Sequence, residues 1–243
     1  MPESGHIVAI GGGGFAGTPS NFAIDTYILS LARCSRPRVG FIPTATGDDS
    51  HYVSIFLAAY SGLDCRPSYL PLFSNTPDLA DWVLKQDVIF VGGGNTMSML
   101  AVWRTWGLDR LLGEALARGA VLAGQSAGAI CWFEQGVTDS WAGPLRVMDC
   151  LGFLAGSCCP HYCGEPERKP AYRAFVGGGE ILPGFAVDDG AAVHFDGGEL
   201  SRVLSWREGT TAYRVTRDDQ SRAQEQPIEP VKLDPVIPDW PVR

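Results

Sequence analysis

Short apolar runs alternate with amphipathic segments over the first half of the chain. The runs that are apolar on both faces, as buried parallel strands are, span His6–Gly11, Arg38–Ala45, Arg66–Leu72, Asp87–Val91 and Ala120–Gly124. The segments with helical spacing span Ser20–Ala32, Asp48–Gly62, Asp78–Gln86 and Asn95–Arg118, the last expected as two helices broken near Gly107. This alternation predicts an α/β fold with a doubly wound, mainly parallel sheet flanked by helices. In such a fold, ligands bind at the carboxyl ends of the strands.

The pattern changes in the C-terminal third. Glycine-rich, β-like stretches span Ile181–Val187, Ala191–Phe195, Leu200–Trp206 and Thr211–Val215, and we expect them to extend or flank the sheet antiparallel. From about Asp218 the chain is polar and rich in proline. We therefore expect one domain over residues 1–217 and a tail over residues 218–243 that packs on or beside it, mostly irregular, with part of it pairing as an edge strand.

Composition narrows the class of protein. Hydrophobic residues make up 45% of the 243 residues and charged residues 19%, which is typical of a well-packed globular domain. A net charge of −8 without a Lys or Arg run gives no reason to expect nucleic acid or an anionic membrane as partner. The N-terminus lacks the pattern of a signal peptide, and no apolar run approaches the ~18 residues of a membrane helix, so we expect a cytoplasmic protein. The seven cysteines are scattered, and we expect reduced thiols.

The strongest chemical motif is Gly124-x-Ser126-x-Gly128, at the end of an apolar run and before a segment of small residues. This is the pattern of a nucleophile elbow, in which a strand enters a helix through a turn so tight that only small neighbours fit around the serine. A helix N-terminus also favours developing negative charge. The motif predicts a serine hydrolase with Ser126 as nucleophile, and the backbone N–H of Ala127 as one oxyanion donor.

Two further glycine clusters stand at strand ends. Gly11–Gly17 contains a formal match to the dinucleotide fingerprint, but no acidic residue ends the second strand and the helix is expected to start after the last glycine. We interpret it as a tight turn beneath the rim of the site. Gly92–Thr96 follows the fourth strand directly, next to the elbow in parallel order. We expect the N–H of Gly93 to complete the oxyanion hole and Gly94, Asn95 and Thr96 to contact substrate, the alternative being a turn and helix cap.

Of the four histidines, His161 is the candidate base. It follows Pro160 in a loop after an apolar run, whereas His6, His51 and His194 lie in or beside expected strands and helices. The neighbouring Cys158, Cys159 and Cys163 do not have the usual spacing of a metal chelate, and no metal site is predicted.

Four motifs together resemble the serine peptidases that include peptidase E, an aspartyl dipeptidase, and cyanophycinase. They are Phe41–Ala45, Val91–Thr96, Gly124–Ala129 and Pro160–Tyr162, in family order. The resemblance implies a fold related to the class I glutamine amidotransferases, a Ser126–His161–acid triad, no cofactor, a short peptide substrate and a homodimer. For the acid it favours Asp139, with Glu134, Glu165, Asp188 and Asp189 as alternatives.

The resemblance also implies specificity for Asp-X dipeptides, with Arg168 binding the acidic side chain. The alternative for Arg168 is a solvated loop residue that pairs with Glu165 or Glu167. The alternative functions are a cyanophycinase-like hydrolase, an amidase or glutaminase, and an inactive small-molecule binder on the same fold. An ordinary α/β-hydrolase is disfavoured, because His161 lies only 35 residues after Ser126, too few for a strand, a helix and the acid between them.

Overall fold

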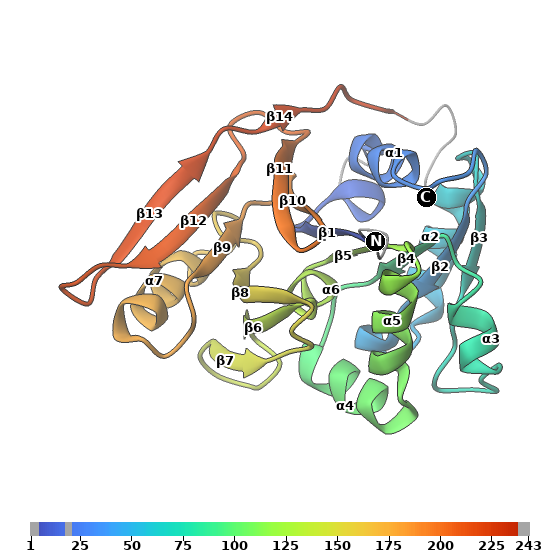
Figure 1. Cartoon of the computed structure of the whole chain (residues 1–243), viewed down its shortest axis with the longest axis horizontal. Helices are drawn as coiled ribbons and strands as arrows, with labels where there is room; N and C mark the ends of the chain where they lie inside the picture. Colours follow the sequence, from blue (N-terminus) through green and yellow to red (C-terminus); the bar gives the residue numbers. More distant parts are fainter. Residues whose placement is uncertain (1–4, 18–20, 238–243) are drawn as a thin grey trace.

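Two sheets organise the chain in the computed structural model, which describes residues 5–17 and 21–237 (Figure 1). The larger has eight strands in the order β14-β11-β10-β1-β5-β4-β2-β3. Its parallel half consists of β1 (His6–Ile10), β2 (Arg38–Ile42), β3 (Arg66–Tyr69), β4 (Val88–Val91) and β5 (Val121–Gln125). All five predicted strands are thus present, with β5 extending one residue beyond its expected run, and the predicted fold class is confirmed.

Helices cover both faces of this sheet. They are α1 (Ala23–Ser30), α2 (Ser50–Ser61), α3 (Leu79–Val83), α4 (Thr96–Trp106) and α5 (Leu108–Ala117), with short 3-10 turns at Gly14–Ala16 and Thr44–Thr46. The predicted break between α4 and α5 is at Gly107, whose φ of 70° is in the left-handed region that glycine adopts without strain. Ser20, the expected first residue of α1, lies outside the described residues.

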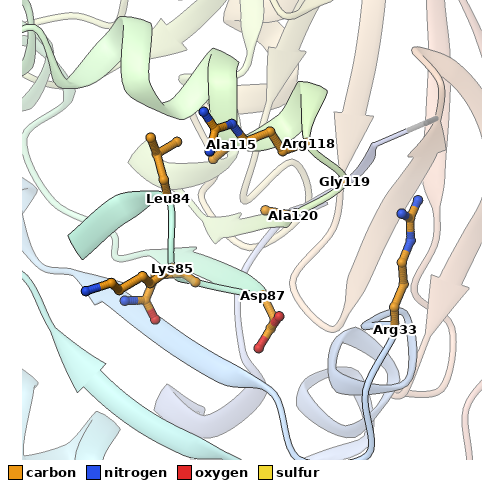
Figure 2. Close-up of a pocket in the computed structure, with 9 residues that line it drawn as sticks. Arg33, Leu84, Lys85, Asp87, Ala115, Arg118, Gly119 and Ala120 are labelled. Carbon is orange, nitrogen blue, oxygen red and sulfur yellow. The ribbon is translucent and has the colours of Figure 1, made fainter. Parts of the chain in front are cut away.

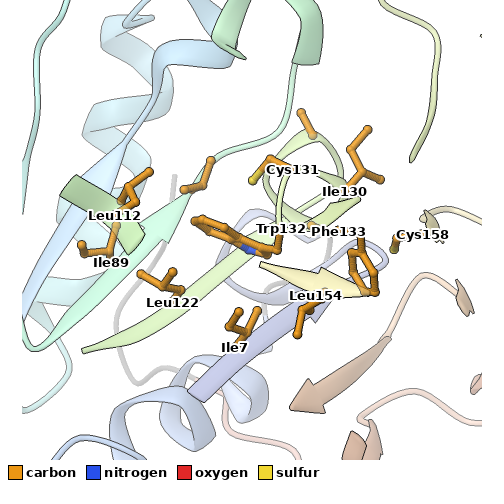
Figure 3. Close-up of a cluster of buried hydrophobic side chains, with 14 of the residues drawn as sticks. Ile7, Ile89, Leu112, Leu122, Ile130, Cys131, Trp132, Phe133, Leu154 and Cys158 are labelled. Carbon is orange, nitrogen blue, oxygen red and sulfur yellow. The ribbon is translucent and has the colours of Figure 1, made fainter. Parts of the chain in front are cut away.

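The core divides along the sheet because side chains alternate between its faces. Val8 and Ile10 of β1 join one cluster with residues of α1 and α2, whereas Ile7 and Ala9 join the other with residues of α3, α4 and α5. The cluster that contains Ile7 and Ala9 continues through Trp132 and Phe133, which follow Ser126 in the chain (Figure 3). It thereby joins the two sheets into one apolar interior.

The C-terminal third is only partly as predicted. Strands β10 (Ala191–Asp196) and β11 (Glu199–Ser205) do extend the large sheet antiparallel, beside β1. However, the chain also forms a second sheet in the order β13-β12-β9-β8-β6-β7, which was not expected. Its strands are β6 (Phe133–Thr138), β7 (Arg146–Asp149), β8 (Leu154–Cys159), β9 (Gly184–Val187), β12 (Ala212–Arg217) and β13 (Ala223–Ile228). The helix α7 (Arg168–Gly178) connects β8 to β9 and packs on β12 and β13.

The segment after residue 217 contributes to both sheets. Strand β13 pairs antiparallel with β12 over six residues, and β14 (Val231–Lys232) pairs parallel with β11. Glu225 of β13 accepts hydrogen bonds from Tyr162 and Lys169, both at 2.7 Å, which fasten this strand to the loop after β8 and to α7. Most of the described residues after 217 are irregular, as expected, and the two strands in this segment both lie at sheet edges.

Candidate active site

The chain turns sharply at Ser126, between β5 and α6 (Ala127–Ile130). Ser126 has φ 55° and ψ −115°, a conformation that is strained for a residue with a side chain. A Cβ atom on Gly124 would lie 2.3 Å from the carbonyl oxygen of Gly128, and one on Gly128 would lie 2.3 Å from that of Val91. Only glycine fits on either side of the serine, so this turn has the geometry of a nucleophile elbow.

The loop after β4 lies against the elbow because β4 and β5 are parallel neighbours. A Cβ atom on Gly93 would be 3.2 Å from the Cβ of Ser126 and 3.7 Å from its Oγ. The N–H of Gly93 donates to the hydroxyl of Tyr52 across 3.4 Å, at the weak end of hydrogen bonding, and Gln125 Nε2 donates to the same hydroxyl at 2.8 Å. Tyr52, a contact that the sequence pattern did not indicate, thus holds the donor beside Ser126.

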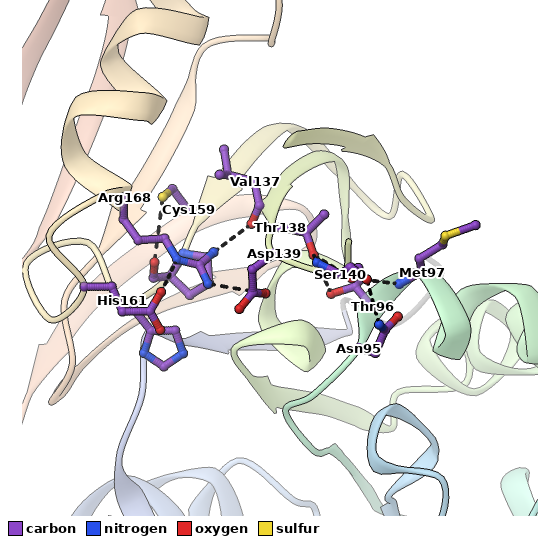
Figure 4. A network of polar contacts seen from close by, with 12 residues as sticks. Asn95, Thr96, Met97, Val137, Thr138, Asp139, Ser140, Cys159, His161 and Arg168 are labelled. Atoms are coloured by element: carbon purple, nitrogen blue, oxygen red, sulfur yellow. Dashed lines mark hydrogen bonds and ion pairs between the residues drawn. The ribbon is translucent and has the colours of Figure 1, made fainter. Parts of the chain in front are cut away.

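The other loop residues have structural partners as well. Asn95 caps α4, with its Oδ1 accepting from the N–H of Ser98 at 2.8 Å, and its Nδ2 donates to the carbonyl of Ser140 at 2.9 Å (Figure 4). Thr96 is buried. Gly94 and Asn95 nevertheless line a pocket of about 290 Å³ that also contains Ser126. This pocket is where a bound acyl group would meet the serine.

His161 and Asp189 are brought together by two neighbouring parallel strands. His161 follows the end of β8 by two residues and Asp189 follows the end of β9 by two residues, and these strands pair in parallel. The Nδ1 of His161 lies 2.6 Å from Oδ1 of Asp189, a short, charge-assisted hydrogen bond. The sequence does carry a signal for this pairing, since Asp189 stands just after an apolar run, as His161 stands just after β8.

The turn after β1 packs directly on this pair. A Cβ atom on Gly12 would lie 2.2 Å from Oδ1 of Asp189 and 2.9 Å from Cε1 of His161. Because Ile10 pairs with Gln125, the same turn also lies beside the elbow. The first glycine cluster thus allows close approach of backbone to the site.

The charge state of Asp189 reflects two opposed effects. Burial raises the pKa of this carboxyl, but the hydrogen bond and charge of His161, with the charges of Arg207 and Arg168, outweigh burial and hold the pKa below its ordinary value. Asp189 is therefore ionised at neutral pH. An ionised carboxylate at Nδ1 leaves Nε2 as the nitrogen that can accept a proton.

Asp139 lies next to Arg168 rather than next to His161 (Figure 4). Its Oδ1 is 3.6 Å from the nearer guanidinium nitrogen, and its side chain is 64% exposed. Arg168 is almost fully buried; its Nε donates to Glu165 at 2.6 Å and its Nη1 to the carbonyl of Val137 at 3.0 Å. The solvated loop arginine considered from the sequence is thus a buried one. Asp139, Glu165 and Arg168 all line the Ser126 pocket.

The remaining acid candidates have other partners. Glu134 accepts from the N–H of Gly156 at 2.7 Å, and the buried Asp188 accepts from the N–H of Thr211 at 3.1 Å. Within residues 5–17 and 21–237, no group of three or more His, Cys, Asp or Glu side chains is placed to hold a metal ion. Nor does any helix in that part of the chain have the length and apolarity to cross a membrane.

A separate pocket of about 190 Å³ lies at the opposite end of the parallel strands (Figure 2). Asp87 and Ala120, which line it, immediately precede β4 and β5, so it lies at the amino ends of these strands. Ser126 lies at the carboxyl end of β5. Since ligands of such sheets bind at the carboxyl ends, the pocket around Ser126 is the candidate site.

Comparison with known proteins finds similarity to a peptidase family and to individual peptidases. Residues 7–203 match the family model described as peptidase family S51. The chain is 50% identical over 220 residues to the uncharacterized peptidase YgaJ of Bacillus subtilis, a match that covers 90% of this chain and 95% of that protein. It is 28% identical to the uncharacterized peptidase Lmo0363 of Listeria monocytogenes over 60% of this chain and 77% of that protein.

Solved structures share the fold. A peptidase from an acI-B1 Actinobacterium superposes with a TM-score of 0.70 at 15% identity, over 94% of this chain and 96% of that one. A putative peptidase E protein from Listeria monocytogenes superposes with a TM-score of 0.62 at 21% identity, over 84% of this chain and all of that one.

Proposed function

Because the chain belongs to peptidase family S51 and is therefore a serine peptidase, we propose that Ser126, His161 and Asp189 are the triad with which it hydrolyses short peptides. The observation that carries this proposal is the 2.6 Å contact between His161 Nδ1 and Asp189 Oδ1. It replaces Asp139, the acid favoured from the sequence, by one of its alternatives. The reason is that Asp139 lies beside Arg168.

In this mechanism, Asp189 accepts a hydrogen bond from the Nδ1–H of His161 and fixes the ring so that Nε2 takes the proton of Ser126. The serine oxygen then forms a bond to the carbonyl carbon of the substrate. The C–N bond of the tetrahedral intermediate breaks as His161 returns the proton to the leaving amine. A water molecule, deprotonated by the same nitrogen, hydrolyses the acyl-enzyme and regenerates the free serine.

The oxyanion of the tetrahedral intermediate is placed between the backbone N–H groups of Gly93 and Ala127. The close approach of Gly93 to Ser126 supports this assignment, and so does the position of Ala127 immediately after the nucleophile. The N–H of Gly93 makes only a long hydrogen bond to Tyr52, at 3.4 Å. A developing oxyanion would be a stronger acceptor for this N–H than the tyrosine hydroxyl.

Asp-X specificity is the finer expectation from the resemblance, and the surroundings of Arg168 weigh against it. The guanidinium already faces the carboxylates of Glu165 and Asp139, and both line the Ser126 pocket. A substrate carboxylate would have to displace one of them and lie close to the other, and like charges at such distances repel. We therefore propose short peptides without an acidic first residue. The expected homodimer stays a prediction that light scattering can check.

The test is labelling by a fluorophosphonate together with amine release from a panel of dipeptides. We expect the wild type to react with the probe, and Ser126→Ala and His161→Ala to lose at least about 10³-fold in both readouts. Ser74→Ala, at an exposed serine far along the chain from the elbow, serves as the matched control. Release of ammonia from carboxamides without peptide cleavage would indicate an amidase instead, and absence of labelling would indicate an inactive binder.

A further inference from the structure

A second and larger pocket adjoins the Ser126 pocket. It has a volume of about 560 Å³ and shares two lining residues, Asp139 and Glu165, with the pocket of the nucleophile. The rest of its lining comes from the loop between β6 and β7 and from the start and outer side of α7: Gly143, Pro144, Leu145, Glu167, Ala171 and Phe175. The second pocket therefore lies next to the pocket in which a peptide would meet Ser126.

The charge of this second pocket is negative. Asp139, Glu165 and Glu167 line it, and no Lys or Arg does. Arg168 contacts two of these carboxylates from its buried position, and its nitrogen donors face Glu165, Asp139 and a backbone carbonyl. One positive charge against three carboxylates leaves an uncompensated negative charge in the pocket.

The other cations near α7 are engaged elsewhere. Lys169 and Arg173 both contact Glu225 of β13, at 2.7 and 3.4 Å. The ammonium of Lys169 also lies over the ring of Tyr162, 5.3 Å from its centroid. Arg146 of β7 lies over the ring of Trp141, at 5.4 Å. These contacts direct Lys169, Arg173 and Arg146 away from the second pocket, so Arg168 is the cation that meets its carboxylates, at Glu165 and Asp139.

The walls between the carboxylates are apolar. Leu145 and Phe175 are partly buried and pack on the cluster around Tyr162 and Tyr172, and Pro144 and Ala171 complete the lining. An apolar ligand side chain would pack on these walls, but it would remove water from the carboxylates and offer them no positive charge in exchange. An acidic side chain would be repelled by them. Lysine and arginine match both parts, because their methylene stems bury against apolar surface while the charged end meets carboxylates.

We propose that the second pocket binds the side chain of a lysine or arginine next to the scissile bond, so that the preferred substrates are short basic peptides. This inference rests on the proposed function, since it places the basic residue relative to Ser126. It names Glu167 as a specificity residue. Glu167 is exposed, and its side chain does not cap α7, so its charge has no structural use that the described contacts reveal.

The experiment compares matched peptides that carry lysine, norleucine or glutamate on either side of the cleaved bond. Norleucine keeps the unbranched hydrocarbon chain and lacks the charge. With the wild type we expect kcat/KM for lysine to exceed that for norleucine by about 10- to 100-fold at one of the two positions, as one charge-assisted contact gives. Added salt should lower this ratio, because two of the three carboxylates lie at the solvent-exposed rim.

Glu167→Gln should reduce the ratio of lysine to norleucine, whereas Glu180→Gln, an exposed glutamate just beyond α7 and outside both pockets, should leave it as in the wild type. A ratio near one at both positions, or a preference for glutamate, with norleucine peptides still cleaved, overturns the inference and leaves the peptidase proposal standing.

A binding measurement tests the second pocket independently of peptide hydrolysis. The Ser126→Ala variant, titrated with the same peptides in a calorimeter, should bind the lysine peptide about 10-fold or more tightly than the norleucine peptide. If the wild type cleaves none of the peptides, such binding would still support the pocket and would refute the proposed hydrolysis. Equal binding of the two peptides would refute the pocket.

Discussion

Replacing Asp189 by asparagine tests the centre of the proposed triad, because the change keeps the shape of the side chain and removes its charge. The 2.6 Å contact with His161 then ceases to be charge-assisted, which costs roughly 1.5–3 kcal/mol and corresponds to about 10- to 100-fold in rate. An amide that turns its NH₂ group toward Nδ1 also forces the ring proton onto Nε2, where it blocks transfer from Ser126. In other serine peptidases the wrong tautomer brings the total loss in kcat to ~10⁴-fold.

The assay is kcat for a neutral peptide together with the rate of fluorophosphonate labelling, which needs no peptide binding. Asp139→Asn is the matched control, because it makes the same chemical change at a carboxylate that is 64% exposed and 3.6 Å from its partner. Exposed pairs of this kind contribute about 0–1 kcal/mol, so this control should stay within about fivefold of the wild type. An Asp189→Asn rate within tenfold of the wild type, beside a collapse in Asp139→Asn, would show that the acid is misassigned.

Stability gives an independent check on the same residue. The pKa of Asp189 is lowered by its surroundings in the folded protein, so its ionised form stabilises the fold above the pKa of the unfolded chain. This stabilisation is lost as the pH falls through the folded value. Asp189→Asn should therefore melt slightly below the wild type at pH 7, and the difference should shrink toward pH 3.

Three other substitutions test the surroundings of the site. Gly128→Ala should destabilise the fold by several kcal/mol in a urea titration, because the added methyl would lie 2.3 Å from the carbonyl of Val91; an unchanged midpoint would contradict the packing described for the elbow. Burial raises the pKa of Asp25 to about 7, so this residue destabilises the fold as the pH rises from about 4 to 7. Asp25→Asn should remove that dependence from melting curves measured at pH 5 and 8, and parallel wild-type and variant curves would refute it. Arg168→Met should lower the free energy of unfolding by about 1–3 kcal/mol, because the carbonyl of Val137 loses its donor whereas Glu165, 43% exposed, returns to water; a loss confined to Asp-X turnover, with stability intact, would restore the substrate role expected from the resemblance.

The parallel half of the fold was predictable because its signals are local. Buried strands such as Val88–Val91 are continuously apolar, and Gly107 interrupts the helical pattern at the residue where α4 ends. The elbow was predictable for the same reason, since steric exclusion around Ser126 acts on its immediate neighbours. Each of these features depends on residues that are adjacent in the sequence.

The second sheet was not predictable by those means. Strand β6 begins with Phe133–Glu134–Gln135, and β7 is exposed at both ends, so neither has the apolar run or clean alternation of a buried strand. Strand β13 contains Pro227, two exposed glutamines and the charged Glu225, yet it is held at the sheet edge by pairing with β12. The choice between Asp139 and Asp189 depended on this sheet, because the position of His161 follows from the pairing of β8 with β9.

The proposed catalytic residues come from different sheets: Ser126 follows β5 of the eight-stranded sheet, and His161 and Asp189 follow β8 and β9 of the six-stranded sheet. Either sheet can keep its own structure while the other is displaced, but proton transfer from Ser126 to His161 requires the two sheets to be correctly positioned against each other. Turnover therefore acts as a sensor of how the two sheets are docked. In mild denaturant, enzymatic activity should therefore be lost at a lower concentration than the far-ultraviolet circular dichroism signal. Loosened packing between the two sheets would separate Ser126 from His161 before either sheet unfolds.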